Sequence, residues 1–159
     1  MIKIILDEFF QHLSDEDKLL YSKIADQAEK LGYKPRKAKT QALNFVFKNN
    51  KTKKHIMKFS IEKEIPVLKM KFYASLEYSY IFHDSVRFAI EEYNYKYTGC
   101  YNGGKCLDEL EGYQYKYDDG RTYFRCGSEL ISLPPVTHHE LPEILKLLNT
   151  QHQYYLSKG

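Results

Sequence analysis

Alternation of apolar and polar side chains between residues 43 and 73 is the feature that most constrains the fold. Three runs each place their apolar side chains on one side of the chain: Leu43, Phe45 and Phe47; Met57, Phe59 and Ile61; Leu68, Met70 and Phe72. A period of two is typical of a strand with one buried face. Asn49-Asn50 is a turn signal between the first two runs. We therefore expect an antiparallel meander with one buried and one solvated face.

Helical spacing of apolar residues appears on both sides of this meander. Ser14 precedes three acidic residues, which predicts a helix N-cap, and Gly32 predicts the C-terminal stop of the same helix. Pro142 suits the first turn of a last helix, with Leu141, Leu145 and Leu148 as its apolar stripe. We expect helices over residues 2–12, 15–31, 79–93 and from 142 onward.

Two further segments connect these elements. Residues 33–40, YKPRKAKT, read as a basic connector. The stretch GYQYKYDDGRTYFRC predicts a hairpin with Asp119-Gly120 as its two loop residues. In that register Tyr115 faces Phe124 and Tyr113 faces Cys126, and residues 129–133 form a third strand.

The element order predicts the fold class. We expect an α+β fold, a mainly antiparallel sheet with helices packed on one face as a two-layer sandwich, in a single domain over residues 1–159. No apolar run approaches the length of about 18 residues that spans a bilayer, and acids interrupt the N-terminal segment early. We therefore expect a cytoplasmic protein with no membrane partner, and the richness in Lys, Ile, Asn and Tyr suggests a bacterial one.

The three cysteines admit three interpretations: a zinc site, a redox pair or free thiols. The loop GCYNGGKC holds Cys100 and Cys106, and the predicted hairpin brings Cys126 near the end of that loop. With His138, these residues form a candidate structural zinc site, because thiolates and imidazole are zinc ligands. The five residues between the first two cysteines exceed the usual two to four, and this spacing favours three free thiols and no cofactor.

Tyrosine is concentrated in the second half of the chain. Eight Tyr fall between residues 93 and 123. A tyrosine ring with its hydroxyl suits a ligand site, although exposed strands are also rich in Tyr. No catalytic motif occurs, and His55 falls in line with buried strand positions, which favours a structural histidine. We therefore expect a non-catalytic protein that binds a small molecule or a protein through Tyr95, Tyr97, Tyr113 and Tyr115.

Charge is segregated along the chain. Residues 34–71 hold twelve Lys or Arg and two acids, whereas the whole chain has a net charge of +3. The alternative function is nucleic-acid binding through the outward face of the meander, with Lys48, Lys54, Lys58, Lys69 and Lys71, joined by Lys34, Arg36, Lys37 and Lys39. Lysines that only solubilise a sheet face are the competing interpretation, and Lys outnumbers Arg eleven to one in this segment.

The stretch DGRTYFRCGSELISL and the last helix, with Gln151 and Tyr154-Tyr155, resemble the C-terminal halves of uncharacterised small bacterial proteins of clostridial type. The resemblance covers about a third of the chain. The resemblance implies a bacterial protein, but it identifies no catalytic or binding residue.

Overall fold

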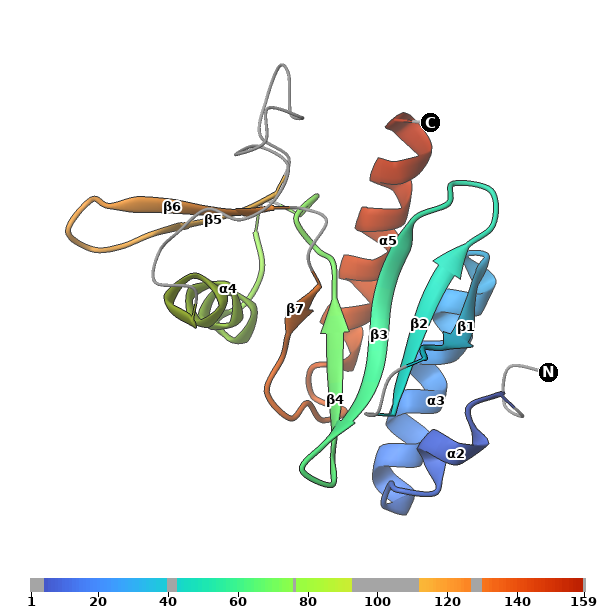
Figure 1. Ribbon diagram of the computed structural model, residues 1–159. Coiled ribbons are helices and arrows are strands. Elements are labelled where there is room, and N and C mark those ends of the chain that lie inside the picture. The colour runs from blue at the N-terminus through green and yellow to red at the C-terminus, as the bar shows by residue number, and fades with distance from the viewer. Residues whose placement is uncertain (1–4, 40–42, 76, 93–111, 127–129, 159) are drawn as a thin grey trace.

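The computed structural model describes residues 5–39, 43–75, 77–92, 112–126 and 130–158. It confirms the predicted α+β class: a five-stranded antiparallel sheet has the order β1-β2-β3-β4-β7, and a separate hairpin pairs β5 with β6 (Figure 1). The strands are β1 (Tyr33–Lys37), β2 (Asn44–Asn49), β3 (His55–Glu62), β4 (Ile65–Met70), β5 (Gly112–Lys116), β6 (Thr122–Cys126) and β7 (Ile131–Ser132). The helices are α2 (Asp7–Phe10), α3 (Asp15–Lys30), α4 (Tyr80–Glu92) and α5 (Leu141–Lys158).

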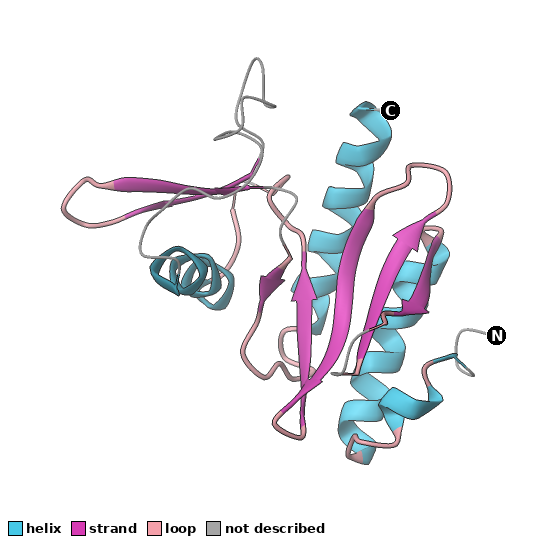
Figure 2. Ribbon diagram, in the orientation of Figure 1, coloured by secondary structure: helices cyan, strands magenta, loops and turns pink. Residues whose placement is uncertain are grey.

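Helices α3 and α5 lie side by side against one face of the large sheet, and the opposite face is toward the viewer (Figure 2). An aromatic cluster fills the space between the layers. Phe59 is at its centre, with ring centroids 4.8 Å from Phe47, 4.9 Å from Tyr21 and 5.1 Å from Phe9. In a chain without Trp, these rings supply much of the buried apolar area that holds the layers together.

The segment expected to be a basic connector is instead strand β1. Tyr33 and Pro35 are buried and alternate with the exposed side chains of Lys34 and Arg36. Proline is tolerated here because β1 is an edge strand, where a missing N–H removes no ladder bond on the open side. This correction places two more basic residues on the outward face of the sheet.

Most of the predicted helix boundaries are confirmed. The Ser14 side chain accepts a hydrogen bond from the Asp17 amide at 3.1 Å, and Gly32 ends α3 with φ +95°. The stripe predicted for α5 is partly wrong, because Ile144 and Leu147 are buried with Leu148, whereas Leu141 and Leu145 are only half-buried. The helix predicted over residues 2–12 is the short α2 within the described residues.

The predicted register of the second hairpin is wrong by one residue. Cys126 lies opposite Gly112, and Tyr113 lies opposite Arg125. The loop has three residues and not two, because the Gly120 amide donates to the Tyr117 carbonyl at 2.9 Å and Gly120 adopts φ +93°. A turn that ends in a left-handed glycine is the usual form of a three-residue hairpin loop.

None of the helices in the described ranges is both long enough and apolar enough to cross a bilayer.

Candidate anion-binding face and tyrosine hollow

Basic side chains form two rows across the face of the large sheet that α3 and α5 leave open. We call this surface the basic face and define it by Lys34, Arg36, Lys48, His55, Lys58 and Lys69. In the strand register, Lys34 lies opposite Lys48, which lies opposite His55. In the next row, Val46 separates Arg36 from Lys58, which lies opposite Lys69. Neighbouring strands lie about 4.8 Å apart, so the cations of a row are close together.

In two of these cross-strand pairs, Lys34–Lys48 and Lys58–Lys69, two positively charged residues lie opposite each other. Like charges directly opposite each other destabilise a sheet. Lys69 is compensated, because its ammonium lies 2.8 Å from the Glu62 carboxylate. Within the described residues, no ion pair compensates Lys34, Lys48 or Lys58. Burial, followed by the charge of Lys69, lowers the pKa of Lys58 below its ordinary value.

A hollow of about 410 Å³ lies on the basic face at its β1 edge. Its basic lining residues include Lys34, Arg36, Lys48 and His55. Desolvation, followed by the charges of Lys71 and Lys48, lowers the pKa of His55 below its ordinary value. The hollow therefore concentrates positive charge where an anion would have several donors within reach.

A β-bulge sets the position of His55. The register between β2 and β3 shifts between Phe47 and Lys48, so that Lys48 faces His55. The expectation that His55 shares the buried side of its strand is wrong, because its side chain is exposed. The bulge breaks the period of two from which that expectation came.

Two of the five predicted lysines do not extend the basic face. Lys54 lies in the turn between β2 and β3, with its ammonium 5.9 Å from the ring centre of Tyr155 on α5. Lys71 is only 8% exposed and follows the end of β4. Lys48, Lys58 and Lys69 remain, and β1 adds Lys34 and Arg36. Lys37, at the end of β1, is paired with Glu8 at 2.7 Å.

The predicted tyrosine site is only partly described. Tyr95 and Tyr97 lie outside the described residues. Tyr113 is a core residue, 1% exposed, whose hydroxyl accepts a hydrogen bond from the Phe72 amide at 3.4 Å. Tyr115 is half-buried, with its ring centroid 4.9 Å from that of Tyr117. The two predicted residues that are described therefore have different environments.

Tyr113 and Tyr115 nevertheless line a hollow of about 480 Å³, which we call the tyrosine hollow. Its other aromatic lining residues are Tyr73, Tyr78, Tyr80 and His83. Sequence reasoning missed them because they come from separate predicted elements, and no local pattern shows that these elements meet in space. The available signal was the concentration of tyrosine in residues 73–80, which include Tyr73, Tyr78 and Tyr80.

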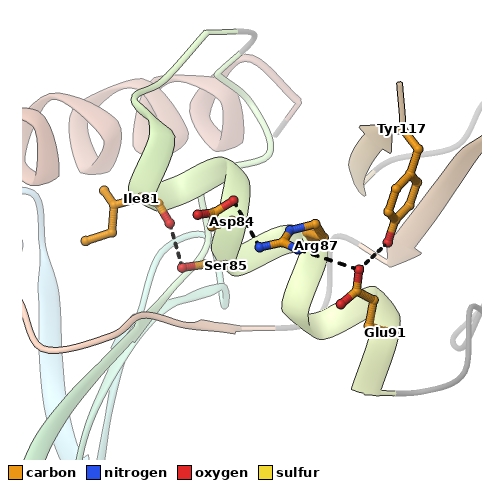
Figure 3. Close-up of polar contacts among 6 residues, drawn as sticks. All are labelled: Ile81, Asp84, Ser85, Arg87, Glu91 and Tyr117. Atoms are coloured by element: carbon orange, nitrogen blue, oxygen red, sulfur yellow. Dashed lines mark hydrogen bonds and ion pairs between the residues drawn. The ribbon is translucent and has the colours of Figure 1, made fainter. Parts of the chain in front are cut away.

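Helix α4 is fixed to the hairpin by a polar network (Figure 3). The Tyr117 hydroxyl donates to the Glu91 carboxylate at 2.8 Å, and Arg87 lies 3.9 Å from the same carboxylate. Arg87 also pairs with Asp84 at 3.4 Å. The network holds the two walls of the tyrosine hollow, α4 and β5, in a fixed relation.

The zinc hypothesis stays a prediction. Cys100 and Cys106 lie outside the described residues, and Cys126 ends β6. His138 is half-buried, and its Nε2 atom is buried without a hydrogen-bond partner in the described part of the chain. Among the residues that the structure describes, no three potential metal ligands come together.

No family model, curated protein or solved structure matches this chain.

Proposed function

We propose that this protein binds the phosphate backbone of a nucleic acid through the basic face. The observation that carries the proposal is the pair of like-charge cross-strand contacts, Lys34–Lys48 and Lys58–Lys69. Each pair costs stability, and a phosphate placed over it would convert the repulsion into attraction. Such sites trade stability for function.

Solubility alone accounts poorly for this arrangement. Lysines that protect a sheet against aggregation are needed on edge strands, where unpaired backbone groups invite another strand. Lys48 and Lys58 lie on β2 and β3, which are both interior strands of the sheet. Solubility also gives no reason to place lysines directly opposite each other.

The composition of the basic face favours contacts with the backbone over contacts with bases. Single-strand binding proteins usually combine cations with aromatic rings on which bases stack. The basic face has one ring, the imidazole of His55, and its rows are otherwise filled by Lys, Arg and Val46. We therefore propose a double helix as the partner, bound with little sequence preference.

A matched set of variants tests the proposal by fluorescence anisotropy with a labelled duplex. Lys48→Gln and Lys58→Gln should each weaken binding about equally for unrelated sequences, because they remove phosphate contacts. Lys146→Gln is the control, since Lys146 is exposed on α5, away from the basic face. Equal weakening by the control, or no weakening by the two face variants, would refute the assignment.

A competition experiment with unlabelled polyanions distinguishes a nucleic acid from other polyanionic partners. Unlabelled duplex should displace the labelled duplex at a lower concentration of phosphate groups than inorganic polyphosphate does. If polyphosphate or an acidic protein competes better per charge, the partner is another polyanion and the nucleic-acid assignment is wrong.

A further inference from the structure

The tyrosine hollow has the chemistry of a second site, independent of the basic face. Its volume of about 480 Å³ falls in the range of small-ligand pockets. Three separate parts of the fold contribute to it: the segment after β4, the first turns of α4, and β5. Small-ligand pockets are lined mainly by hydrophobic and aromatic side chains, as this hollow is.

The inner wall of the hollow is fixed before any ligand arrives. Tyr113 packs against Phe72 and Tyr73, with ring centroids 5.2 and 5.7 Å away. On the other side, the rings of Tyr78 and His83 lie 4.4 Å apart. A wall of rings held by the core loses little freedom on binding, which favours affinity.

The rim of the hollow remains accessible. Tyr80, in the first turn of α4, is 77% exposed. Gln114 and Lys116 on β5 are also exposed and offer polar groups at the same opening. The lining described by the structure includes five tyrosines, one histidine and one lysine, but no carboxylate.

We infer that the tyrosine hollow binds a flat aromatic ring of the nucleobase type. The exposed ring of Tyr80 suits stacking on a planar ring, and the exposed Gln114 amide suits hydrogen-bonding groups on that ring. The absence of a carboxylate from the described lining disfavours a cationic ring, and Lys116 tolerates a negatively charged substituent.

Adenosine is the probe, because it has a base but no phosphate. We therefore expect no binding of adenosine to the basic face. Titration should give saturable binding by calorimetry and upfield shifts of the adenine protons in NMR spectra, as expected for a ring stacked on tyrosines. Tyr80→Ala should weaken binding about fivefold or more, and Tyr80→Phe should retain most of the affinity.

Phe88→Ala is the matched control, since Phe88 is on the same helix, 62% exposed, and does not line the hollow. It should leave adenosine binding unchanged, as should Lys58→Gln. Absence of saturable binding, or an equal loss in Phe88→Ala, would overturn the inference. Binding of a simple sugar in place of adenosine would also overturn it, because the ligand would then not be an aromatic ring. Tyr80 is exposed, so the Tyr80→Ala chain should fold, which circular dichroism checks.

Discussion

Lys58 on β3 lies directly opposite Lys69 on β4, and the Glu62 carboxylate lies 2.8 Å from the Lys69 ammonium. The sheet therefore contains a like-charge pair in which Lys69 forms an ion pair with Glu62, whereas Lys58 feels the Glu62 charge less strongly than the repulsion of Lys69. A second like-charge pair, Lys34 and Lys48, lies two strands away, and neither of its members forms an ion pair in the described residues. This repetition of an unfavourable pairing on one face supports the proposal that the face binds a polyanion.

Removal of the Lys58 charge, which forms no ion pair in the described part of the chain, should stabilise the protein. We expect Lys58→Gln to raise the free energy of unfolding by about 0.2–1 kcal/mol, because it relieves the repulsion across the strand pair. Urea denaturation monitored by circular dichroism measures the change. Lys69→Gln is the control and should not stabilise, because it also removes the ion pair with Glu62. A Lys58→Gln protein less stable than the parent would mean that the pair is not repulsive.

Affinity for the duplex should rise as the pH falls through the range in which His55 titrates. Burial and two neighbouring lysines lower the pKa of His55 from its ordinary value of 6.5, so the free protein holds this ring neutral near pH 7. A bound phosphate adds negative charge and raises this pKa, so binding takes up a proton and strengthens as the pH falls below 6.5. Anisotropy titrations at several pH values should show this trend, and His55→Gln should flatten it. An equal trend in the variant would place the titrating group elsewhere.

Two glycines with similar backbone angles should differ in their tolerance of alanine. Gly32 and Gly120 have φ of +95° and +93°. A Cβ at Gly32 would lie 2.9 Å from the side-chain nitrogen Nδ2 of Asn49, which donates to the Leu31 carbonyl. A Cβ at Gly120 would meet nothing within 4 Å. We expect Gly120→Ala to cost about 1 kcal/mol and Gly32→Ala about 2 kcal/mol or more. Equal losses in urea denaturation would show that the Asn49 contact is unimportant.

The sequence predicted the fold class and the meander because period and turn residues are local signals. It did not predict β1, where Pro35 and a run of basic residues are typical of a connector. The pairing of β1 with β2 depends on burial of Tyr33 under the helices, which is a tertiary contact.

The site was predicted in part for the same reason. Alternation identified Lys48, Lys58 and Lys69 as outward residues, but no single strand reveals which lysine faces which. The bulge at Lys48 and the three-residue loop at Gly120 each insert one residue that the period of two does not anticipate. The first insertion changed the predicted side of the His55 side chain, and the second changed the predicted partner of Cys126.

The most direct test of the account is the salt dependence of duplex binding. Release of counterions lowers the logarithm of the affinity by about 0.9 per contacted phosphate for each unit of log salt concentration. Lys34, Arg36, Lys48 and Lys58 make no ion pair in the described part of the chain. With these four cations in contact with phosphates, we expect a slope of about −3 to −4 between about 50 and 200 mM salt, reduced by about 1 in Lys48→Gln. A slope near zero, or one that Lys48→Gln leaves unchanged, would contradict the claim that the basic face binds the nucleic-acid backbone.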